Sequence, residues 1–100
     1  MGQLITIWWR DIPLQVIARE GRQNEKRILD KRFQFAVDKA AMNAGRKAYG
    51  DYIEEMRRSE RPCGDDLRAE ADAELARIDA AYTKAVIHAL IASGGAGERL

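Results

Sequence analysis

Hydrophobic residues in the first twenty positions follow the two-residue period of β-strands. Residues 4–9 are mostly β-branched or aromatic on both alternating sets, which predicts a strand covered on both faces. In residues 14–18, positions that suit the core alternate with positions that suit solvent, which predicts a second strand with one polar face. The stretch between them carries Trp8 and Trp9 and is broken by Pro13. The pattern therefore predicts a β-hairpin that ends at Glu20 and Gly21.

From residue 23 the apolar period changes to that of an α-helix. Residues 23–44 are predicted to form one helix, ended by Gly45 and contacted on two sides. Its main stripe is Leu29, Phe33, Ala36, Val37, Ala40 and Ala44, and its second row is Ile28, Phe35 and Met42. A short helix is predicted at residues 47–58, before the break at Pro62-Cys63-Gly64, with Tyr49, Tyr52, Ile53 and Met56 directed inward.

A last helix is predicted at residues 65–92, where apolar side chains recur at steps of three and four. Asp65 or Asp66 is expected to cap its N-terminus. At 1.5 Å per residue this helix is about 42 Å long, so part of it is expected to project from the core or to pack on a second subunit. Its inward row is Leu67, Ala71, Leu75, Ile78, Tyr82, Ala85 and Ala89, with a polar side formed by Glu74, Arg77, Ala81, Lys84 and His88.

These elements predict an α+β fold in which an N-terminal β-hairpin packs against three helices, the last one long. Residues 1–93 are expected to form a single domain and residues 94–100 a flexible tail. A chain of 100 residues with 46% hydrophobic content suffices for one modest core. The single Cys63 excludes an intramolecular disulfide, which fits a reducing cytoplasm, and no apolar run is long enough for a membrane span.

The net charge of +1 hides an asymmetry between the two halves of the chain. Residues 1–50 hold 10 Lys or Arg and 5 Asp or Glu, whereas residues 51–100 hold 7 and 11. Such a bipole favours an acidic or phosphate-bearing partner, or self-association in which unlike ends meet. Two solvated faces without a partner are the alternative.

The hairpin is the first candidate binding surface. Two strands alone leave backbone edges open, so either charged guards (Arg10, Arg19 and Glu20) or a strand from a partner must cover them. Trp9 is assigned to the core with Ile5 and Ile7, and Trp8 to an interface. The interface candidates are Trp8, Arg10, Asp11, Pro13 and Gln15. The alternative is that Arg10 and Asp11 serve only to form the turn.

A second candidate is the basic face of the helix predicted at residues 23–44. Its members are Arg22, Lys26, Arg27, Lys31, Arg32 and Lys39, in a density that suits phosphate contacts. Acidic residues are interleaved among them and the pI is about 7.9, so a solvated charged face is the better interpretation.

Catalytic and metal-binding patterns are weak. His88 falls on the polar side of the last helix with no partner to orient it, so we interpret it as a surface histidine. Cys63 lies before a predicted helix N-terminus, but without a second cysteine a redox or nucleophilic role is the minor alternative. We expect no enzyme activity, no cofactor and no metal site.

The segment Leu4-Ile5-Thr6-Ile7-Trp8-Trp9-Arg10-Asp11-Ile12-Pro13-Leu14-Gln15-Val16-Ile17 resembles the start of a small bacterial family named "virulence factor", which is related to part of the conserved virulence factor C proteins. Phe33, Ala36, Asp38, Ala40-Ala41-Met42 and Gly45 also fit that family. Its name reports a phenotype and not a reaction. Free-standing members accompany one-carbon and corrinoid methyl-transfer genes, so the resemblance implies an accessory role.

Together these observations favour a non-enzymatic interaction module of a bacterial cytoplasmic protein or complex, which binds a protein partner or a second copy of itself. Binding of nucleic acid or nucleotide phosphate through the basic face is the alternative hypothesis.

Overall fold

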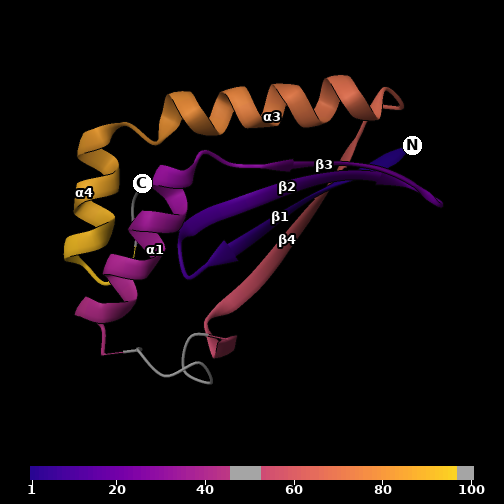
Figure 1. The fold of residues 1–100 in the computed structure, drawn as a ribbon. Helices are drawn as coiled ribbons and strands as arrows, with labels where there is room; N and C mark the ends of the chain where they lie inside the picture. The colour runs from indigo at the N-terminus through magenta and orange to yellow at the C-terminus, as the bar shows by residue number, and fades with distance from the viewer. Residues whose placement is uncertain (46–52, 97–100) are drawn as a thin grey trace.

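The computed structural model describes residues 1–45 and 53–96 and places a four-stranded antiparallel sheet beside helices (Figure 1). The elements run β1 (Gly2–Trp9), β2 (Ile12–Glu20), β3 (Gln23–Ile28), α1 (Lys31–Asn43), β4 (Met56–Cys63), α3 (Leu67–Ala81) and α4 (Lys84–Ala92). The strand order is β3-β2-β1-β4. This architecture confirms the predicted α+β class and the N-terminal hairpin.

The turn of the β1–β2 hairpin is shorter than the sequence pattern predicts. Trp9 pairs with Ile12, so only Arg10 and Asp11 connect the strands, and Arg10 has a positive φ of 51°. Pro13 lies inside β2. The register shifts there, because Ile7 pairs with Gln15 and Trp8 with Pro13. A bulge of this kind accommodates a proline within a central strand.

The prediction of one helix over residues 23–44 is wrong for its first third. Residues 23–28 form β3, which pairs with β2 along its whole length. Gly21 has a φ of +60° and lies in the tight turn between paired Glu20 and Gln23. The helix α1 begins only after Asp30, whose carboxylate accepts a hydrogen bond from the backbone N–H of Arg32 at 3.2 Å.

The short helix predicted at residues 47–58 is wrong where the structure can be compared with it. Residues 47–52, with Tyr49 and Tyr52, lie outside the described residues. Ile53 is exposed and not inward, and Met56 begins β4, which pairs with β1 from end to end. Both edges of the hairpin are therefore occupied by strands of the same chain. The expected uncovered hairpin edges are not present.

The last predicted helix is two helices in the structure. The helix α3 begins after its N-cap Asp66, as expected, but ends at Ala81, and Thr83 caps a new helix, α4. A guanidinium nitrogen of Arg32 donates to the carbonyl oxygen of Tyr82 at 3.0 Å and so stabilises the interruption. The new helix axis changes the inward row: Ile87 and Leu90 are buried, whereas Ala85 and Ala89 are exposed.

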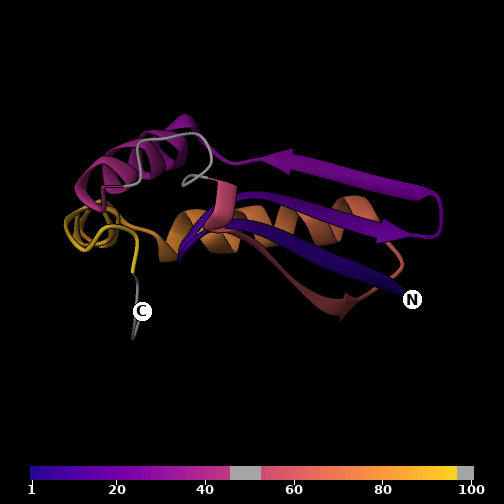
Figure 2. The same cartoon turned by 90° about the horizontal axis from the view of Figure 1, so that it is seen from below.

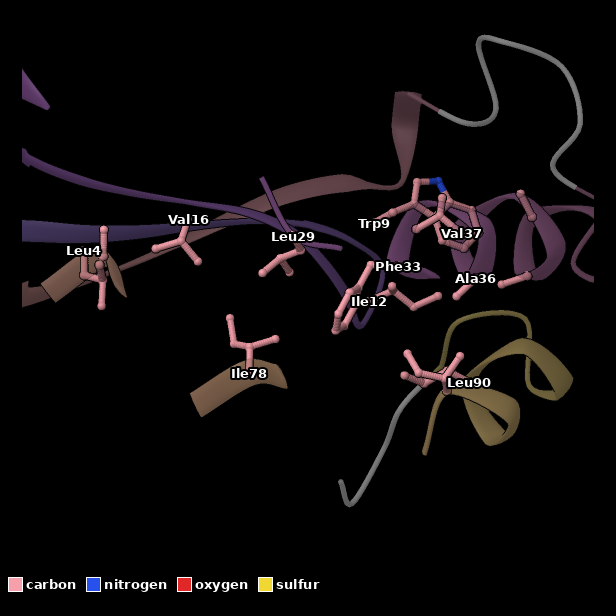
Figure 3. Packing of buried hydrophobic residues seen from close by; sticks show 14 of the residues in the cluster. Leu4, Trp9, Ile12, Val16, Leu29, Phe33, Ala36, Val37, Ile78 and Leu90 are labelled. Carbon is pink, nitrogen blue, oxygen red and sulfur yellow. The ribbon is translucent and has the colours of Figure 1, made fainter. Parts of the chain in front are cut away.

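The core lies between α3 and one face of the sheet and continues to the end where α1 and α4 pack. Figure 3 shows Leu4 and Val16 of the sheet on the side of Ile78 from α3. Trp9, fully buried as predicted, packs in the same cluster. The second row predicted for the first helix lies outside the core: its members Ile28, Phe35 and Met42 are all solvent-exposed.

The helices cover the sheet unequally. In Figure 2 the sheet lies in front of α3, and no described helix crosses its near face. The helices α1 and α4 pack together beyond the end of the sheet that carries the β1–β2 turn (Figure 1). No helix of the described residues is long and apolar enough to cross a membrane.

Gly94 and Gly95, placed by prediction in a flexible tail, are tied to the β1–β2 turn. The backbone N–H of Asp11 donates to the carbonyl oxygen of Gly95 at 3.0 Å, and Arg10 Nη1 donates to that of Gly94 at 2.9 Å. Gly95 has a φ of +93° and its backbone lies against the ring of Trp9. Residues 97–100 lie outside the described residues.

Candidate functional site

The sheet face opposite α3 carries apolar side chains that no described helix covers. Alternation from the core residue Leu4 places Ile5 and Ile7 of β1 on this face, and the strand pairing adds Ile17 of β2 beside Ile5. Ile28 of β3 is 67% exposed at the end of the same row. Ile5 is only 2% exposed, so the accessible apolar surface of this face comes from half-buried Ile7 and Ile17 and from exposed Ile28, which we call the aliphatic row.

A hollow of about 290 Å³ lies at the end of this row, next to α1. It is lined by Ile7, Leu14, Gln15, Ile28, Leu29, Phe33, Gln34 and Met56. Most of these side chains are apolar, and two amides, those of Gln15 and Gln34, supply hydrogen-bonding groups. A hollow of this size suits one or two side chains of a protein partner, whereas small-molecule sites usually start near about 300 Å³.

Basic side chains flank the aliphatic row. Arg19, Lys26 and Arg58 alternate with the core-facing positions of their strands, so they share the face of Ile5 and Ile17. Arg58 donates to Glu60 on the same strand at 2.6 Å, whereas Arg19 and Lys26 have no ion pair with any described residue. The face therefore combines apolar surface with a positive surplus, which suits an acidic protein surface.

The interface candidate Trp8 is engaged within the sheet. Its indole Nε1 donates to Ser59 Oγ at 2.9 Å, and the guanidinium of Arg57 lies 4.6 Å from the ring centroid. The side chain is half-buried against β4. Its position ties two strands together and leaves little surface for a partner.

Arg10 and Asp11 hold the β1–β2 turn against distant segments. Arg10 donates to Glu55 Oε1 at 3.2 Å as well as to the Gly94 carbonyl oxygen, and its guanidinium lies 5.3 Å from the ring centroid of Trp9. Asp11 Oδ1 accepts from Arg57 at 2.9 Å. These contacts are those of a structural turn.

The remaining two interface candidates differ in burial. Pro13 is fully buried in β2. Gln15 is half-buried and lines the hollow beside α1. Of the five side chains, Gln15 alone lies on the open sheet face within the described structure. Ile5 is buried as predicted, whereas Ile7, predicted in the core, and Ile28, predicted in a helix, lie on this face because the uncovered face depends on where α3 packs.

The basic candidates do not share one face of a helix. Arg22 lies in the β2–β3 turn and Lys26 and Arg27 in β3, while Lys31, Arg32 and Lys39 lie in α1. Arg27 is paired with Asp72 at 2.7 Å and Arg32 with Asp79 at 3.2 Å. Acidic residues of the second half of the chain thus neutralise basic residues of the first half, so much of the charge bipole is satisfied within the domain.

One buried charged group lies outside these predictions. Glu74, expected on the polar side of the last helix, is only 5% exposed. Hydrogen bonds from Arg77, at 2.5 and 2.8 Å, and then Arg61, at 3.1 Å, hold the pKa of this carboxyl below its ordinary value, against the effect of burial. The cluster joins α3 to β4, and the side chains of Arg61 and Arg77 remain 56% and 59% exposed.

Cys63 and His88 lie apart from each other, at the end of β4 and on the exposed side of α4. Burial, followed by the charge of Glu70, raises the pKa of the Cys63 thiol, which lowers its reactivity at neutral pH. Within residues 1–45 and 53–96, no group of three His, Cys, Asp or Glu side chains is placed to hold a metal ion.

A family model matches most of the chain. The sequence model of the family described as "Virulence factor" matches residues 7–91, from the middle of β1 to the last turn of α4. No curated protein and no solved structure matches the chain. Because the matched segment includes every described helix and all four strands in whole or in part, the chain belongs to the Virulence factor family.

Proposed function

We propose that this domain is a non-enzymatic, cytoplasmic accessory module that binds an acidic surface of a protein partner through the sheet face opposite α3. The observation that carries the proposal is the aliphatic row of half-buried Ile7 and Ile17 and exposed Ile28, which no described helix covers. Exposed apolar surface with a polar rim is typical of protein interfaces.

The charges around the row define the partner. Arg19 and Lys26 have no ion pair within the described residues, so an acidic partner surface gains attraction without displacing an internal carboxylate. The hollow next to Gln15 is suited to one anchoring apolar side chain. The cytoplasmic location is supported by the single cysteine, which has no disulfide partner in the chain.

The test is quantitative capture of partners by the tagged domain and by two variants. Ile28→Asp places a charge at an exposed position of the row, where the substitution should change the stability of the fold little. Met42→Asp makes the same change at an exposed position of α1, away from the sheet face, and is the matched control. Each eluate is divided into nuclease-treated and untreated halves.

The proposal requires a protein that is recovered with the wild-type and Met42→Asp domains in both halves and is lost with Ile28→Asp. Truncation of a well-packed anchor costs about 2 kcal/mol, or about 30-fold in affinity, which washing makes visible. Recovery that depends on intact nucleic acid, or that is equal for all three proteins, contradicts it. Sedimentation of the purified domain shows whether the partner is a second copy.

A further inference from the structure

A second concave site lies far from the open sheet face, between helices. The helices α1 and α4 lie side by side in both Figures 1 and 2, and with the end of α3 they enclose a groove of about 490 Å³. This volume falls within the range of small-molecule sites, about 300–1,000 Å³.

The walls of the groove are apolar and come from all three helices or their ends. Phe35 of α1 faces Ile87 and Ile91 of α4, and Tyr82 lies at the junction of α3 and α4. The Tyr82 ring packs edge-on against the buried ring of Phe33, with centroids 5.8 Å apart, which fixes its position. Phe35 is 57% exposed although it lines this hollow, so a ligand there gains apolar contact that the chain itself does not supply.

The Arg, Lys and Asp side chains at the groove carry a net positive charge. Arg32 donates hydrogen bonds to the Tyr82 carbonyl oxygen and to Asp79 Oδ1. The charges of Arg32 and Asp79 offset each other in this ion pair. Lys84 also lines the groove and has no ion pair with any residue of the described ranges. The imidazole of His88 is a further lining group without a described partner. One positive charge is therefore left over beside an apolar cavity.

From this arrangement we propose that the groove between α1 and α4 binds a small amphipathic carboxylic acid, with its apolar body against Phe35, Ile87 and Ile91 and its carboxylate beside Lys84. A neutral ligand would leave the Lys84 ammonium unused, and a cationic one would be repelled by it. The site is separate from the sheet face and does not depend on the proposed partner binding.

Decanoate is the probe, because it joins one carboxylate to an aliphatic chain that the groove can hold. Binding is measured by isothermal titration calorimetry below micelle-forming concentrations and located by amide NMR shifts. Wild-type protein is compared with Lys84→Gln, which removes the charge, and with Phe35→Ser, which removes an exposed part of the wall. Arg68→Gln removes an exposed charge at the start of α3 instead and is the control.

The expected result is saturable one-to-one binding with shifts concentrated in α1 and α4. Lys84→Gln and Phe35→Ser should each weaken decanoate binding about fivefold or more, while Arg68→Gln binds as the wild type does. Decanol should bind more weakly than decanoate and be insensitive to Lys84→Gln. Absence of saturable binding, shifts located on the sheet, or equal affinity of wild type and Lys84→Gln would each overturn the proposal.

Discussion

Gly95 is a position where one added methyl group should measurably destabilise the domain. Its φ of +93° lies in the region that residues with a Cβ rarely adopt. A Cβ built there would lie 2.7 Å from Cζ3 and 3.2 Å from Cε3 of Trp9. Trp9 is fully buried, so the ring has no free space in which to move away.

Two responses to Gly95→Ala compete, and the cheaper one sets the loss of stability. If the segment stays in place, the left-handed backbone costs about 1–2 kcal/mol and the overpacking about 1–3 kcal/mol. If the segment detaches, the hydrogen bonds from Asp11 and Arg10 are lost, at about 0.5–1.5 kcal/mol each, and part of Trp9 is uncovered. We expect a loss of about 2–3 kcal/mol in the free energy of unfolding.

Gly21→Ala is the matched control for this measurement. Gly21 also has a positive φ, of +60°, but a Cβ there would meet no atom within 4 Å. The control therefore carries only the backbone cost. Urea unfolding followed by tryptophan fluorescence should show Gly95→Ala to be less stable than Gly21→Ala by about 1 kcal/mol, with unchanged slopes. Equal losses in the two variants would refute the inferred packing of Gly95 on Trp9.

Three further predictions concern single side chains. Thr83→Ala removes the N-cap of α4 and should lower the free energy of unfolding by about 1 kcal/mol, measured by urea unfolding, whereas Thr83→Ser should retain most of it. Glu74→Gln should cost about 1–2 kcal/mol at pH 7. The pKa of Glu74 in the folded protein lies below its ordinary value of 4.5. The Glu74 carboxylate therefore stabilises the fold above pH 4.5, and this stabilisation is lost as the pH falls through the folded pKa. The difference in the free energy of unfolding between wild type and Glu74→Gln should accordingly shrink from about pH 7 to about pH 3. Cys63 should react with iodoacetamide at pH 7 more slowly than free cysteine, and rapid labelling of the native protein would contradict its raised pKa.

The strands that the sequence pattern predicts correctly are those whose own residues are strongly hydrophobic. Residues 4–9 and 14–18 are apolar enough to require burial wherever they pack, and they form the two central strands. The edge strands β3 and β4 are polar, and most of their residues are exposed. Their conformation is set by backbone pairing with β2 and β1, a non-local interaction that a hydrophobic period does not report.

The helix errors have the same physical origin. Steps of three and four continue through Tyr82 and Thr83, so nothing in the period marks the break between α3 and α4. The break is stabilised by Arg32, which lies 50 positions from Tyr82 in the chain. The open sheet face was likewise inaccessible to sequence reasoning, because Ile7 looks like a core residue until the position of α3 is known. The cap at Asp66 depends on neighbours close in sequence, and the burial of Trp9 follows from its large apolar side chain, so both were predictable.

The position of β4 at the outer edge of β1 has a consequence for how the chain acquires its fold. The three strands of the first 28 residues can pair as successive hairpins through local contacts, on the microsecond scale typical of hairpins. The partner of β1 on its other side arrives only with residues 56–63, so the Trp8–Ser59 hydrogen bond joins positions 51 apart. During synthesis the free edge of β1 is thus exposed to other chains until this late segment emerges. Pairing of β4 with β1 closes a long loop, which makes it the slow step in forming the sheet. Because Arg57 of β4 stacks on Trp8 of β1, the fluorescence of Trp8 should report when this pairing forms.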